Sequence, residues 1–88
     1  MAEISVERAG NAYRVTIADA AATFVVTIPS GYPARLGLSH VTPEELLRAS
    51  FEFLLAREPA SSILARFELP VIERYFPEYP REIARALG

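Results

Sequence analysis

The chain has 88 residues, of which 51% are hydrophobic, and it carries a net charge of −2. This length supports one domain with a small core, and the lack of cysteine excludes disulfides, thiolate metal sites and a cysteine nucleophile. The lack of lysine excludes Schiff-base chemistry and a P-loop lysine, and the acidic balance argues against nucleic acid and anionic membranes as partners.

Residues 2–29 predict three β-strands, because apolar and polar residues alternate with a period of two between short turns. The apolar positions on the expected core face are Ile4, Val6, Tyr13, Val15, Ile17, Phe24, Val26 and Ile28. Connections of only a few residues favour an antiparallel β-meander over any crossover arrangement.

Residues 30–41 are the longest segment predicted to be a loop, since glycine and proline interrupt every regular pattern there. Only residues 34–38 have the composition of a short fourth strand. His40, the single histidine, lies at the end of this segment, and we interpret it as a solvated loop residue. The alternative is a small hydrolase or ligand-binding site that uses His40 and the loop of residues 29–40.

Residues 42–58 predict a long central helix with a well-defined start. Thr42 is a good N-cap, Pro43 suits the first helical position, and Glu45 completes a capping box. The polar positions form one narrow strip, and apolar residues cover the rest of the circumference, which is more than one sheet can cover. Either the C-terminal segment or a second subunit must therefore cover the remaining face.

Residues 59–88 contain four prolines, which divide this segment into two or three short amphipathic helices. Most of the aromatic side chains here are expected to pack on the core. A candidate interaction surface is formed by the aromatic residues of the central helix and the tail, namely Phe51, Phe53, Tyr75, Phe76 and Tyr79.

Two resemblances are carried by particular stretches. FLLAREPASSILARFELPVIERYFPEY, within the C-terminal half, resembles small uncharacterised prokaryotic proteins of similar size and implies no activity. Strands followed by TPEELLRASFEFLL are similar in order to HicB-type antitoxins, a resemblance that implies a regulatory protein partner. The glycine-rich strand and turn motifs of that family have no counterpart in this chain.

The sequence thus predicts a single α+β domain in which a three-stranded antiparallel meander precedes a long central helix and two or three short helices. We expect a non-catalytic protein-interaction or regulatory module, antitoxin-like in its role, with no catalytic residue, metal site or cofactor. The high apolar content favours a homodimer. No leader or membrane-spanning run is evident, so a cytoplasmic location is expected. The composition, rich in arginine and poor in Asn, Gln, Cys and Met, fits a GC-rich source and two interpretations of it, a thermophilic organism or codon bias alone.

Overall fold

The computed structural model describes residues 3–88 and shows an α+β domain built on a four-stranded mixed sheet. Three antiparallel strands follow one another along the chain, β1 (Ile4–Ala9), β2 (Ala12–Ile17) and β3 (Ala22–Thr27). A fourth strand, β4 (Arg66–Glu68), pairs in parallel with β3 and forms the far edge of the sheet. The expected start of the first strand at residue 2 lies outside the described residues.

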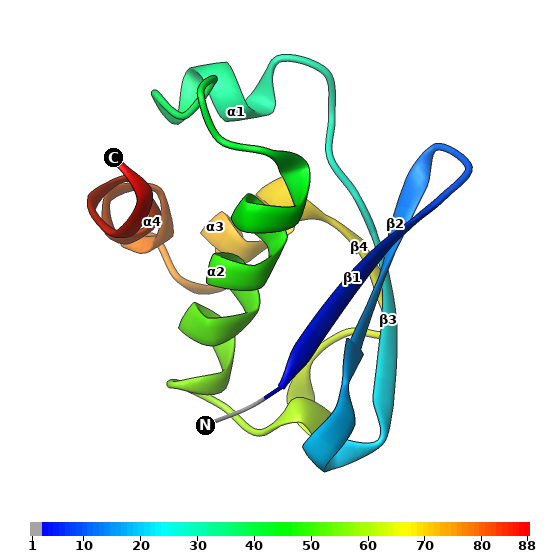
Figure 1. Cartoon of the computed structure of the whole chain (residues 1–88). Coiled ribbons are helices and arrows are strands. Elements are labelled where there is room, and N and C mark those ends of the chain that lie inside the picture. The colour runs from blue at the N-terminus through cyan, green and yellow to red at the C-terminus, as the bar shows by residue number, and fades with distance from the viewer. Residues whose placement is uncertain (1–2) are drawn as a thin grey trace.

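Within the described residues four α-helices accompany the sheet: α1 (Tyr32–Arg35), α2 (Pro43–Leu55), α3 (Ile72–Tyr75) and α4 (Tyr79–Leu87). Short 3₁₀ turns occupy Ala18–Ala20, Ala60–Ser62 and Leu69–Val71. Helix α2 packs on one face of the sheet, α4 lies on the side of α2 away from the strands, and the opposite sheet face is open (Figure 1). In the part of the chain that is described, no helix is long and apolar enough to cross a bilayer.

The strand pattern follows the predicted alternation. Val15, Ile17, Phe24 and Val26 are buried against the helices, whereas Arg14 on the other face is exposed. Arg14 lies opposite Glu7 across the β1–β2 pair, and the two side chains form an exposed ion pair at 2.9 Å. Pairing in this register keeps the buried apolar side chains of the three strands on the helix-covered face, whereas Val25 lies beside Arg14 on the other face.

Helix α2 begins as the sequence predicts. The Glu45 backbone N–H donates to Thr42 Oγ1 at 3.1 Å, and Glu45 Oε1 accepts from the Thr42 backbone N–H at 2.9 Å. The two residues therefore satisfy each other's free groups in a complete capping box. The Glu45 carboxylate accepts hydrogen bonds from the Thr42 backbone N–H and, at 3.1 Å, from the Thr42 hydroxyl, and these hold the pKa of the Glu45 carboxyl below its usual range.

The apolar circumference of α2 is covered on two sides within a single chain. Phe51 faces the sheet and lies 5.1 Å from Phe24, centroid to centroid. Phe53 faces the tail, and its ring makes edge contacts with Phe76 at 5.8 Å and Tyr79 at 5.3 Å. The C-terminal segment thus supplies the second layer of cover that the composition of α2 demands.

The predicted three-stranded antiparallel sheet was incomplete, and residues 34–38 do not form the additional strand. A helix, α1, occupies Tyr32–Arg35 instead, because Pro33 fixes a helical φ in its first turn. The fourth strand comes from residues 66–68, inside a segment predicted to be helical. The spacing of Ile63, Leu64 and Phe67 resembles a helical stripe, but the pairing with β3 through parallel hydrogen bonds overrides this local preference.

Two hydroxyl-centred contacts tie the helices together in the interior. Tyr32 donates a hydrogen bond to the Glu73 carboxylate, which joins α1 to α3. Ser50 Oγ donates to the Leu46 carbonyl at 2.6 Å, so the Tyr79 hydroxyl is the donor in its 2.7 Å contact with Ser50. Burial raises the pKa of Tyr79 to about 12, and burial followed by the hydrogen bond to Glu73 raises the pKa of Tyr32 further still.

Replacing the N-cap tests the start of α2. Thr42→Ala should lower the free energy of unfolding by about 0.5 to 2 kcal/mol, because one N-terminal amide of the helix loses its acceptor. Urea denaturation followed by circular dichroism measures this loss, with Ser39→Ala as an exposed loop control. Denaturation midpoints that coincide with the wild type would remove the capping box as a source of stability.

Removing the buried hydroxyl of Tyr79 tests whether this group makes the stability of the fold depend on pH in alkaline solution. Tyrosine in the unfolded chain titrates near its ordinary pKa of 10.0, whereas folded Tyr79 does so at about 12. A raised pKa favours unfolding as the pH rises from the ordinary value toward the raised one. Tyr79→Phe should therefore lose stability less steeply than the wild type over this range, as measured by urea denaturation. Tyr75→Phe, which deletes an exposed hydroxyl, is the matched control, and equal slopes for wild type and Tyr79→Phe would contradict the expectation.

Candidate interaction groove

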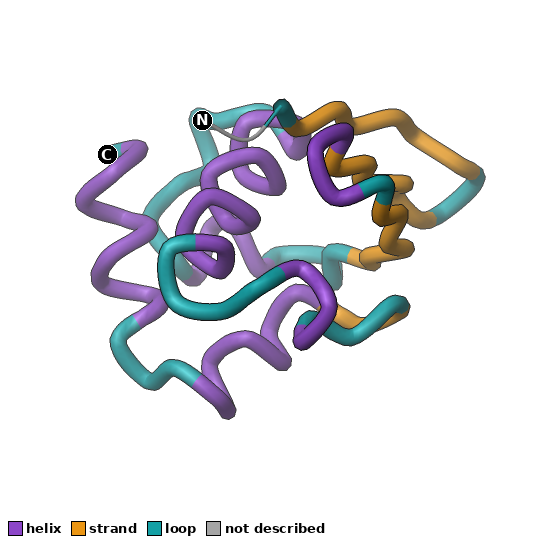
Figure 2. Tube along the Cα trace, turned by 90° about the horizontal axis from the view of Figure 1, so that it is seen from below, coloured by secondary structure: helices purple, strands orange, loops and turns teal. Residues whose placement is uncertain are grey.

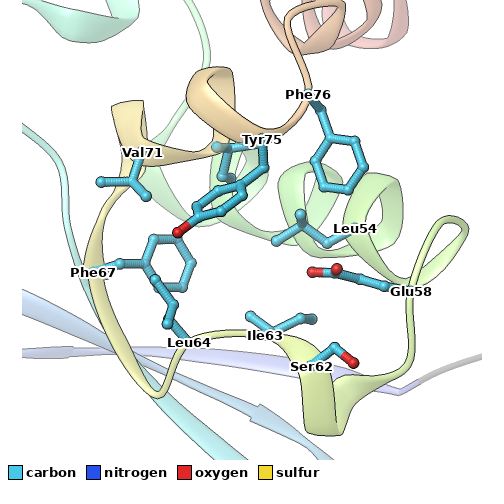
Figure 3. A pocket seen from close by; sticks show the side chains of 10 residues that line it. Leu54, Glu58, Ser62, Ile63, Leu64, Phe67, Val71, Tyr75 and Phe76 are labelled. Atoms are coloured by element: carbon cyan, nitrogen blue, oxygen red, sulfur yellow. The ribbon is translucent and has the colours of Figure 1, made fainter.

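An apolar pocket of about 150 Å³ opens beside β4, between the end of α2 and α3 (Figure 3). Most of the side chains that line it are aliphatic or aromatic. They are Leu54, Glu58, Ser62, Ile63, Leu64, Phe67, Val71, Ile72, Tyr75 and Phe76. A cavity of this volume accommodates one side chain of leucine or phenylalanine size, and we refer to it as the groove.

Two exposed apolar side chains stand at the groove. Among the large hydrophobic residues of the described chain, only Leu64 and Tyr75 are exposed, at 49% and 65% of their surfaces. Both belong to the wall of the groove, although they come from different elements (Figure 3). Single exposed apolar residues need no explanation, but their gathering at one apolar pocket is typical of an interaction site.

The groove has one charged group, the carboxylate of Glu58, which follows the end of α2. Within residues 3–88, Glu58 forms neither an ion pair nor a side-chain hydrogen bond. The neighbouring Arg57 is engaged elsewhere, since its guanidinium stacks over Phe53 at 3.6 Å and contacts Glu78 at 3.4 Å. Because Arg57 also donates to the Phe53 carbonyl at 3.1 Å, the end of α2 is held in place as one wall of the groove.

Strand β4 borders the groove and has a free edge. It is the last strand of the sheet, so only β3 pairs with it, and Figure 2 shows it at the margin of the molecule. The Val25 N–H donates to the Ala65 carbonyl at 2.8 Å, which fixes the residues whose backbone groups face β3. Backbone direction alternates along a strand, so the N–H and C=O groups of Arg66 and Glu68 face away from the sheet.

The candidate residues from the sequence lie in two environments. Phe51, Phe53 and Tyr79 are buried in the core, with Phe51 and Tyr79 fully enclosed. Tyr75 and Phe76 line the groove, where Tyr75 is the exposed member of the pair. The candidate interaction surface therefore separates into a core cluster and a groove wall.

His40 lies in the connection between α1 and α2, whereas the groove lies beside β4. Its Nε2 atom is 3.3 Å from the carbonyl oxygen of Leu87, so the histidine joins the loop after α1 to the last turn of α4. The side chain is exposed and does not line the groove. Its contact is that of a side chain at a helix C-terminus, where free carbonyl groups accept hydrogen bonds.

Of the groove residues, only Tyr75 and Phe76 were candidates from the sequence, and the exposed Leu64 was expected to belong to an amphipathic helix that covers the core. A usable signal was the adjacent pair Ile63 and Leu64, because neighbouring side chains in an extended segment point to opposite sides. In the structure Ile63 is buried and Leu64 is exposed, and both line the groove. The signal was obscured because this segment was predicted to be helical.

The groove has no arrangement typical of a cofactor or metal centre. In residues 3–88, no three side chains of His, Asp or Glu approach closely enough to hold a metal ion. Comparison of this chain with protein-family models, with curated proteins and with solved structures finds no match. The geometry of the groove is therefore the basis for assigning a function.

Proposed function

We propose that this protein is a non-catalytic interaction module that binds an extended protein segment along β4 and the groove. The observation that carries the proposal is the meeting of a free sheet edge with Leu64 and Tyr75, the two exposed large apolar residues within residues 3–88. An added strand would gain main-chain hydrogen bonds from the edge and specificity from the pocket beside it.

The chemistry of the groove supports binding rather than catalysis. Its polar groups are a glutamate, a serine and the hydroxyl of Tyr75, in an otherwise apolar lining. Glu58 lacks a basic partner among the described residues, so a segment with an apolar side chain next to a basic one would complement the groove. The alternative of a hydrolase using His40 gains no support from the contact of that residue with α4.

The proposal extends to the cellular role that the sequence predicts. A small module that adds a strand from another protein suits a regulatory, antitoxin-like role in the cytoplasm, where its partner would be a protein chain. Homodimeric assembly belongs to the same proposal, because strand addition at an edge also joins identical subunits.

Peptide selection with mapping by NMR tests the function directly. Peptides selected from a random displayed library against dilute protein should shift the amide signals of Leu64, Arg66, Glu68 and Tyr75. Leu64→Glu should weaken their binding by about tenfold or more, because a charge enters an apolar contact. Ala65→Glu places the same charge on the adjacent exposed residue and should leave binding within about threefold of the wild type.

The distribution of the shifted signals decides between the two functions. Shifts confined to β4 and the groove support the interaction module. Selected ligands that instead shift the signals of residues 29–40, with no response to Leu64→Glu, would contradict it.

A further inference from the structure

We infer that the segment bound at this edge is β4 of a second copy of the chain, paired antiparallel about a two-fold axis at Phe67. The inference rests on the proposed function and names its partner. It predicts a continuous eight-stranded sheet across the dimer, since each copy contributes a four-stranded sheet ending at β4.

The charges of β4 are self-complementary in this register. The strand reads Arg66, Phe67, Glu68. Antiparallel pairing about Phe67 sets Arg66 opposite the partner's Glu68 and, by symmetry, Glu68 opposite the partner's Arg66. Both side chains are exposed on the open sheet face, and neither forms an ion pair within the described chain. Opposite charges directly across an antiparallel pair stabilise that pairing.

The backbone of β4 suits the same register. The groups of Phe67 face β3, so Phe67 and its symmetry mate would form a non-hydrogen-bonded pair. The outward groups of Arg66 and Glu68 would then bond those of the partner's Glu68 and Arg66. Pro70 has no N–H and sits just beyond the strand, so the ladder ends there and the register cannot slip toward it.

The groove would close in this dimer. Phe67 lies on the helix side of the sheet, 6.1 Å from Phe51, and lines the groove. Side chains of a non-hydrogen-bonded pair lie close together, so the two Phe67 rings and the two grooves would meet at the axis. Leu64 and Val71 both line the groove and lie on either side of β4 in the chain, so they would stand beside the paired strands. The exposed apolar residues of the groove would thereby become covered.

The other edge of the sheet does not offer an equivalent pairing. Its charged residues, Glu7 and Arg8, are adjacent on β1 and therefore point to opposite faces. If the helices of both copies lie on the same side of the joined sheet, a two-fold pairing of β1 cannot place Glu7 of one copy directly opposite Arg8 of the other copy. Glu7 is also already paired with Arg14 in its own chain. Charge complementarity thus favours β4 over β1.

Charge reversal and its rescue test the pairing. Sedimentation equilibrium of the full chain across the micromolar range should show a reversible monomer–dimer equilibrium. Arg66→Glu should raise the dimer dissociation constant by about tenfold or more, because two like-charge contacts replace two attractive ones. The double variant Arg66→Glu with Glu68→Arg should restore the constant to within about threefold of the wild type.

Arg8→Glu is the matched control, because it makes the same charge change on the opposite edge strand and should leave dimerisation unaltered. Circular dichroism of each variant shows that the fold is retained. A wild type that remains monomeric, or a double variant no tighter than Arg66→Glu, would overturn the β4 pairing. A monomer that still binds selected peptides at Leu64 and Tyr75 would overturn this inference and leave the proposed function standing. A monomer that binds no peptide there would overturn both.

Discussion

The fold depends on the burial of α2 from two sides. Helix α2 has apolar residues over most of its circumference, and Phe51 and Phe53 point toward different layers. The sheet covers the side of Phe51, and the tail covers the side of Phe53 through Phe76 and Tyr79. A fully buried phenylalanine contributes several kcal/mol, so each layer is needed in a domain whose total stability is on the order of 4 to 13 kcal/mol.

The groove is a consequence of how the tail reaches α2. Residues 60–68 must pass from the end of α2 to the edge of the sheet before α3 and α4 return over the helix. That path creates β4 with one free edge and leaves a pocket between it and the end of α2. Arg57 contacts Phe53 and Glu78 and so holds this end of α2 in place. The end of the helix therefore forms a fixed wall of the pocket. A single structural requirement therefore accounts for both the apolar pocket and the unpaired strand.

Local signals predicted the parts of this fold that local forces determine. The capping box at Thr42 and Glu45 located the start of α2, and period-two alternation located β1, β2 and β3. Strand β4 has three residues and one apolar side chain, and its pairing with Val25 to Thr27 joins segments about 40 residues apart. No window of sequence contains that information. Tyr75 was a candidate because of its aromatic, proline-rich surroundings, whereas Leu64 became evident only from its exposure beside the buried Ile63.

One chain covers α2 on both sides, and native-state hydrogen exchange is the measurement that tests this coverage most directly. The slowest amides of α2 and α4 should exchange with the same free energy of opening, because neither helix stays folded when the other leaves. The free energy of opening should change little with protein concentration. Any stabilisation that dimerisation adds should raise it equally for α2 and α4. If α4 instead opens at a much lower free energy while α2 stays protected, the tail does not supply the second layer of cover for α2.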